Sequence, residues 1–199
     1  MNYEKIILDL YDRVVSLEKK VADLEVQLVD PKISITEEEM SGATSEKITR
    51  NSSRQYVMDK LTSENPDFII TKGNRAIKAD ILLKTTEDEI IYKLKAKFYH
   101  SKSFNKFPSG WHTVRKDDLL NEDIHLFIFN IEFEKNFYTF LFSRQELLSF
   151  VTDKTTDQNH LYHFYFHVNE DKAMEVRDQE KDVAPYFNHW KLPSEMLKK

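Results

Sequence analysis

The sequence predicts an α/β fold in which helices flank a mixed β-sheet, preceded by an N-terminal coiled-coil helix. Apolar residues recur with a heptad spacing near the N-terminus, and segments of alternating apolar residues follow, interleaved with helical patterns. The 199 residues include 14 Phe and nine Tyr but three Gly, a balance that disfavours disorder and Gly-rich phosphate-binding folds. This length accommodates one domain of about 150 residues with an appendage.

Residues 1–30 are predicted to form a parallel coiled-coil helix that makes the protein a homodimer. β-Branched residues at position a and Leu at position d favour two parallel strands. Arg13 and Lys20 at g would face Glu18 and Glu25 at e of the partner helix. The alternative is an amphipathic helix packed on its own domain. The seam consists of Ile7, Leu10, Val14, Leu17, Val21, Leu24 and Leu28.

A polar, acidic linker at residues 31–46 separates this helix from a domain predicted to span residues 47–199. The domain is expected to open with a helix that begins between Thr49 and Ser53 and ends before Pro66. The remaining elements complete a mixed sheet flanked by helices, with a loop between the third and fourth strands. Strands are predicted over 67–71, 76–84, 90–99, 124–133, 137–143 and 160–168, and helices over 144–151 and 185–193.

Composition excludes several classes of function. The chain has no Cys, which excludes a disulfide scaffold, a thiolate metal site and a Cys nucleophile. Charge interrupts every long apolar run, so we expect no membrane-spanning helix, and the N-terminus lacks the pattern of a signal peptide. A cytoplasmic protein is therefore expected. The net charge of −5 gives no global indication of nucleic-acid binding.

Two residues on neighbouring predicted strands carry the most informative motif. Asp80 lies in KADILL and Lys97 in IIYKLKAKF, and the turn TTEDE joins the two segments. This arrangement resembles the PD-(D/E)XK nuclease superfamily, which has a restriction-endonuclease-like fold. The resemblance covers residues 47–192, with SGWHTVRKDDL, LFIFNIEF, FYTFLFSRQEL, YHFYF and FNHWKL downstream. It implies a helix, then a hairpin with an acid on one strand and (Asp/Glu)-x-Lys on the next.

The resemblance also implies a divalent metal, with Asp80 as a ligand. In this family two carboxylates and a backbone carbonyl hold Mg²⁺, which activates water, and a lysine stabilises charge. Here Lys95 stands where the motif has its second acid, and the helix acid falls near Arg54 or Gln55. Because an ammonium group repels a metal cation, the resemblance implies a degenerate metal site.

Three interpretations of the catalytic positions Asp80, Lys95 and Lys97 follow. The protein either binds nucleic acid or a partner without cutting, or cuts DNA with Mg²⁺ and a displaced acid such as Glu64 or Glu89. The third interpretation is a non-enzymatic protein-interaction scaffold. In the simplest structural case, Asp80 forms an ion pair with Lys95 or Lys97 on the neighbouring strand.

A basic segment at residues 93–116 strengthens the prediction that the partner is DNA. It contains seven bases and no acid, with aromatic residues interleaved. Such a segment can neutralise phosphates and stack on bases. The alternative is a solvated strand face with a loop whose aromatics belong to the core. The predicted nucleic-acid contacts are Lys93, Lys102, Lys106, Trp111, Arg115 and Lys116.

Overall fold

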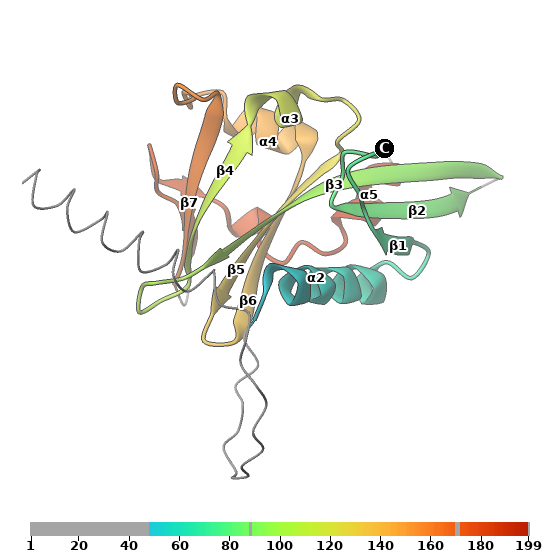
Figure 1. Ribbon diagram of the computed structural model, residues 1–199, viewed down its shortest axis with the longest axis horizontal. Helices are drawn as coiled ribbons and strands as arrows, with labels where there is room; N and C mark the ends of the chain where they lie inside the picture. The colour runs from blue at the N-terminus through green and yellow to red at the C-terminus, as the bar shows by residue number, and fades with distance from the viewer. Residues whose placement is uncertain (1–47, 88, 170–171, 199) are drawn as a thin grey trace, which may run out of the picture. The chain divides into compact units, whose positions relative to one another are not determined.

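The computed structural model describes residues 48–87, 89–169 and 172–198, which form helices packed on two β-sheets (Figure 1). The predicted coiled-coil helix at residues 1–30 and the linker at residues 31–46 lie outside the described residues. The elements in chain order are α2 (Arg50–Glu64), β1 (Ile69–Lys72), β2 (Ile81–Glu87), β3 (Ile90–Lys102), β4 (Ser109–Arg115), α3 (Lys116–Leu120), β5 (Leu126–Phe133), β6 (Asn136–Ser143), α4 (Arg144–Phe150), β7 (Leu161–Asn169), β8 (Lys172–Glu175), β9 (Lys181–Asp182), the 3₁₀ turn η1 (Ala184–Tyr186) and α5 (Leu192–Leu197).

The main sheet has five strands in the order β1-β2-β3-β5-β6. Strands β1, β2 and β3 are antiparallel to their neighbours, β3 and β5 run parallel, and β5 and β6 are antiparallel. The prediction of an α/β fold with a mixed sheet is therefore confirmed. Strand β2 begins at Ile81 rather than at residue 76, because residues 75–78 form a turn.

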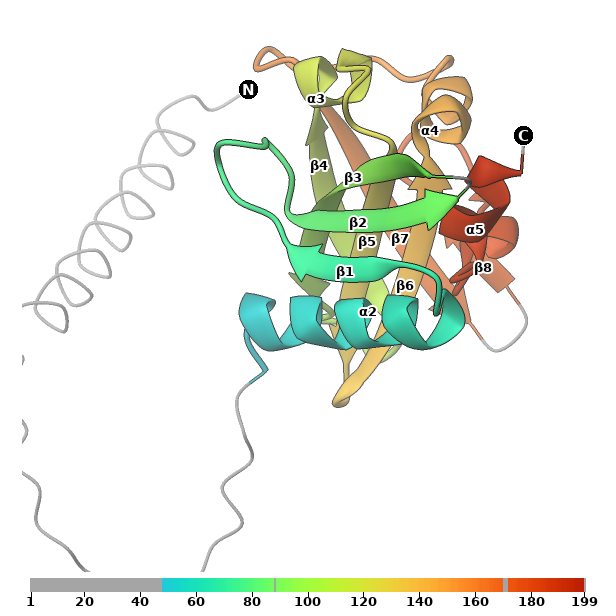
Figure 2. The ribbon, with the colours of Figure 1, turned by 90° about the vertical axis from the view of Figure 1, so that its right-hand side faces the viewer.

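Helix α2 forms because its sequence supplies a cap, an apolar stripe and a stop. The Thr49 side chain accepts a hydrogen bond from the Ser52 N–H, and the Ser52 side chain accepts one from the Thr49 N–H. Val57 and Leu61 are buried against the main sheet. Asn65 ends the helix, and Figure 2 shows α2 running beside β1.

A second sheet, β4-β7-β8-β9, is entirely antiparallel and packs on the face of β5 opposite α2. Strand β5 is buried on both sides: Phe127 and Phe129 enter an aromatic core shared with the second sheet, while Leu126 and Ile128 enter the core under α2. Burial on both sides explains why its sequence is almost continuously apolar.

One sheet and a loop before residue 124 were expected from the sequence, and this prediction was wrong. Strand β4 and helix α3 occupy part of that region, and β8 and β9 were also missed. The inward-facing residues of β4 include a buried His112 beside Val114, so an apolar alternation is absent from its sequence. Among the described residues, no helix combines the length and apolar character needed to cross a membrane.

Candidate functional site

Strands β2 and β3 bring Asp80 and Lys97 to one pocket. The Asp80 N–H donates to the Ala96 carbonyl at 2.9 Å, and the Phe98 N–H donates to Asp80 Oδ2 at 3.1 Å. Asp80 and Lys97 both line a pocket of about 430 Å³. The pairing of the hairpin thus joins the two residues on which the resemblance depends.

A tight loop before β2 forms another wall of this pocket. The Gly73 N–H donates to the Asp80 carbonyl at 2.9 Å, and a Cβ at residue 73 would overlap the Ala79 carbonyl oxygen. Only glycine allows this close approach of the two backbones. The loop presents Arg75 and Lys78, which are exposed pocket-lining cations.

The ion pairs of the pocket differ from the predicted ones. Asp80 Oδ1 lies 3.4 Å from Arg50 Nη2, which also donates to the Phe98 carbonyl at 2.9 Å. Lys97 instead pairs with Asp118 at 2.8 Å, and Lys95 pairs with Asp123 at 3.2 Å. The prediction that Asp80 pairs with a lysine of the adjacent strand was therefore wrong, because α3 and the turn after it supply acids to both lysines.

Asp118 is the second carboxylate of the pocket, and it was not among the candidate site residues predicted from the sequence. It lies in α3 and lines the same pocket as Asp80 and Lys97. The displaced acids considered from the sequence, Glu64 and Glu89, do not line this pocket. Glu87 pairs with Ile90, so Glu89 lies at the tip of the hairpin, seven residues before Ala96, whose partner Ile81 is at the opposite end of the hairpin. Glu64 ends α2, whereas Arg50 at the other end reaches Asp80.

The residues of this pocket do not fit a Mg²⁺ ion. Four cationic side chains and two carboxylates line it, and both carboxylates are in ion pairs. Arg54, near the position expected for the helix acid, is one of these cations. Across the part of the chain that the structure describes, no three His, Asp or Glu side chains are grouped to hold a metal. The cations are Arg54, Arg75, Lys78 and Lys97, and the carboxylates are Asp80 and Asp118.

The predicted basic segment is divided between separate surfaces. By strand alternation Lys93, Lys95 and Lys97 share one face of β3, whereas Lys102 projects from the opposite face and lies 3.5 Å from Glu132. Lys106 lines a different pocket, next to Phe107 and Val168. Acids distant in sequence pair with three lysines of this segment, so the segment is free of acids in sequence but not in the fold.

The aromatic residues of the segment have different environments. Trp111 lies on β4 and is 46% exposed, and the Arg177 guanidinium lies 4.9 Å from its ring centroid. Phe104 is 93% exposed, whereas Phe98 is buried in the core under α2. Phe104 is therefore the ring of this segment most open to stacking, whereas a face of Trp111 is covered by Arg177.

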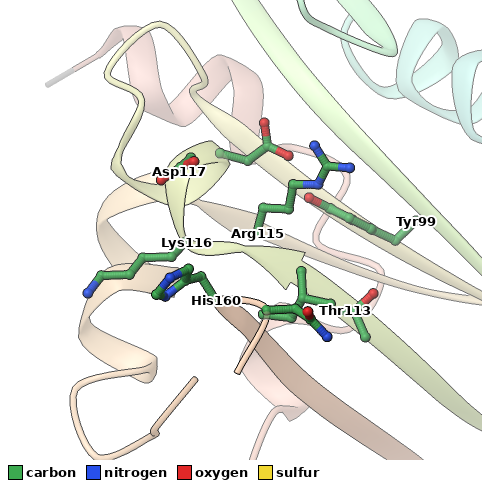
Figure 3. A pocket seen from close by; sticks show the side chains of 9 residues that line it. Tyr99, Thr113, Arg115, Lys116, Asp117 and His160 are labelled. Atoms are coloured by element: carbon green, nitrogen blue, oxygen red, sulfur yellow. The ribbon is translucent and has the colours of Figure 1, made fainter. Parts of the chain in front are cut away.

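A second pocket, of about 510 Å³, adjoins the first and shares Asp118 with it. Figure 3 shows the side chains that line it, with the hydroxyl end of Tyr99 directed toward Arg115. Burial raises the pKa of the Tyr99 phenol, and the Asp118 and Asp80 carboxylates raise that pKa further. The lining residues are Tyr99, Thr113, Arg115, Lys116, Asp117, Asp118, Asn159, His160 and Leu161.

Comparison with known proteins gives one structural similarity. The chain is similar to the bacterial homing endonuclease I-Ssp6803I, at 14% sequence identity and a TM-score of 0.43. The matched region covers 74% of this chain and 91% of the endonuclease. No protein-family model matches the sequence, and no curated protein matches it.

Proposed function

We propose that this protein binds nucleic acid, most directly DNA, through the pocket around Asp80 and Lys97, and does not cut it. One observation carries the proposal: cationic side chains outnumber carboxylates two to one in this pocket, and each carboxylate already has a cationic partner. Such a pocket favours a phosphate oxyanion over a metal cation.

The position of the pocket agrees with this proposal. It opens where β2 and β3 place the PD-(D/E)XK-like residues Asp80 and Lys97. Lys93 and Lys95 continue along the same face of β3. Lys95 is paired with Asp123, and Lys93 is the exposed cation of this row that would contact a phosphate backbone beside the pocket. In this proposal the protein is a degenerate relative of the nuclease superfamily that acts as a homodimer.

Salt-dependent DNA binding tests the proposal. Arg75→Gln with Lys78→Gln removes two exposed pocket cations, and Lys60→Gln with Lys191→Gln removes two exposed cations elsewhere. We expect the first pair to weaken binding at least about tenfold and to lower the slope of log affinity against log salt by about two, whereas the control pair has little effect. The measurement is fluorescence anisotropy with a labelled duplex in EDTA. Absence of salt-dependent binding would favour the scaffold interpretation.

A Mg²⁺-dependent DNA endonuclease is the second candidate, and Asp118 favours it. This carboxylate is displaced from the motif but lines the same pocket as Asp80 and Lys97. A plasmid-nicking assay with Mg²⁺ separates the two candidates. We expect no cleavage by the native protein. Cleavage that Asp80→Ala and Lys97→Ala each abolish would establish the endonuclease instead.

A further inference from the structure

The Tyr99 hydroxyl is a buried hydrogen-bond donor at the edge of the second pocket. Among the described residues, this oxygen is buried and has no hydrogen-bond partner. The Tyr99 ring stacks on the rings of Phe129 and Phe127, with centroid distances of 5.2 Å and 6.5 Å, and this packing fixes its position. A buried, unpaired hydroxyl costs about 1–3 kcal/mol, so a ligand oxygen that accepts a hydrogen bond from it would gain affinity. Tyr99 lines the second pocket, and Figure 3 shows its hydroxyl end directed toward Arg115.

The pocket that Tyr99 lines also contains donor groups that can bind an anion. The guanidinium of Arg115 and the amide of Asn159 supply N–H donors, and Thr113 supplies a hydroxyl. The pocket also contains two acids, Asp117 and Asp118, but Asp118 is paired with Lys97 at 2.8 Å. Lys116 adds a second cation at the rim, although its ammonium points away from Tyr99 in Figure 3.

We propose that this second pocket binds a backbone phosphate of the nucleic acid, with the Tyr99 hydroxyl and the Arg115 guanidinium donating to its oxygens. The inference rests on the proposed function and names a further contact within it. Asp118 lines both pockets. A nucleic-acid strand that passes from one pocket to the other would therefore meet phosphate-binding groups on each side of this residue. Tyr99 would then be a binding residue that the basic composition of the segment does not reveal.

DNA-binding measurements on two pocket variants and their controls test the inference. Tyr99→Phe removes the hydroxyl alone, and we expect about tenfold weaker binding with an unchanged salt slope, because the lost donor is neutral. Arg115→Gln should weaken binding and reduce the salt slope by about one. Tyr138→Phe and Arg144→Gln are matched controls, since neither residue lines either pocket, and both should bind as the native protein does.

Thermal melts separate a binding role from a structural one. Tyr99→Phe should fold with equal or greater stability, because it removes a polar group that has no partner in the described part of the chain. A large loss of stability would show that the hydroxyl serves the fold and would overturn the inference.

NMR of protein labelled at tyrosine Cζ identifies the source of the phosphate. The Tyr99 signal, assigned from Tyr99→Phe, should shift with DNA but not with inorganic phosphate or deoxythymidine monophosphate at the same concentration. A shift with either small molecule but not with DNA would overturn the inference in favour of a small phosphorylated ligand. Native DNA binding that neither Tyr99→Phe nor Arg115→Gln changes would overturn it while leaving the proposed function intact. Native protein that fails to bind DNA would overturn both.

Discussion

The ion-pair partners of Asp80 and Lys97 determine which kind of ligand the two residues can bind. Their spacing is the feature on which the resemblance rests, but Asp80 pairs with Arg50 and Lys97 pairs with Asp118. A carboxylate that accepts a hydrogen bond from the Phe98 N–H and faces a guanidinium has little free capacity for a metal. The local charges therefore favour an anionic ligand at a position where the resemblance implies a cation.

His112 is a buried titratable group whose effect on stability can be measured. Burial lowers its pKa from 6.5 to about 3, and Nε2 lies 3.2 Å from Ser101 Oγ. Between these two values the unfolded chain binds a proton that folded His112 does not, so stability is lost as pH falls below 6.5. We expect His112 to contribute about 1.4 kcal/mol per pH unit to this loss.

Urea unfolding of His112→Gln at about pH 7 and about pH 5 checks this contribution. The variant should lose less stability than the native protein between the two pH values. His189→Gln is the control, because His189 is partly exposed and pairs with Glu195 at 2.9 Å. An unchanged pH dependence in His112→Gln would contradict the role assigned to this residue.

The junction of β4 with the main sheet depends on Gly110. A Cβ at this position would lie 2.5 Å from Ile131 Cγ1 and would also overlap Ser101 Oγ. Ile131 is fully buried and cannot easily move. We expect Gly110→Ala to lower the free energy of unfolding by about 1–3 kcal/mol. Because Ile131→Ala removes both Cγ1 and Cδ1, Gly110→Ala should cost less stability in that background than in the native protein in urea denaturation, and equal stability of native protein and Gly110→Ala would refute the close contact.

A buried ion pair fastens the segment after α4 to the second sheet. Lys154 Nζ lies 2.8 Å from Glu175 Oε2 and 2.7 Å from Asp178, and its side chain is 3% exposed. The other oxygen of Glu175 accepts hydrogen bonds from the N–H groups of Tyr165 and Arg177. The arrangement leaves Glu175 dependent on one lysine for its charge balance.

Lys154→Met should therefore destabilise the protein by about 3–5 kcal/mol, because it leaves the Glu175 carboxylate buried without its cation. Lys60→Met, on the exposed surface of α2, should change stability by less than about 0.5 kcal/mol. Chemical denaturation at neutral pH measures both. A loss in Lys154→Met no larger than in the control would show that Glu175 finds another partner or a proton.

Elements with regular local patterns were predictable from the sequence, and those that depend on tertiary burial were not. The stripe of Val57 and Leu61 before Pro66 identified α2, and the alternation of Leu94, Ala96 and Phe98 with lysines identified β3. Strand β4 could not be predicted in this way, because a buried histidine stands where an alternating pattern would have an apolar residue. Asp118 was missed for a different reason: it reaches Lys97 only through the packing of α3 beside β4, which no spacing in the sequence encodes.

The oligomeric state of the whole chain is a separate prediction. Leu17 lies at the middle of the predicted seam, so Leu17→Asp would bury a charge at a d position and should produce a monomer. Ser16→Asp is the matched control, because position c faces solvent in a heptad helix. Light scattering of the full chain measures both, and a Leu17→Asp protein that stays dimeric would favour the alternative of a helix packed on its own domain.

A crystal structure of the full chain with a short DNA duplex and Mn²⁺, in place of Mg²⁺, would examine the Asp80 pocket directly. We predict a phosphate group within hydrogen-bonding distance of Lys97 and the Arg75–Lys78 loop, with no anomalous peak between Asp80 and Asp118. A Mn²⁺ peak shared by these two carboxylates would contradict the proposal and show that the pocket holds the metal of a nuclease.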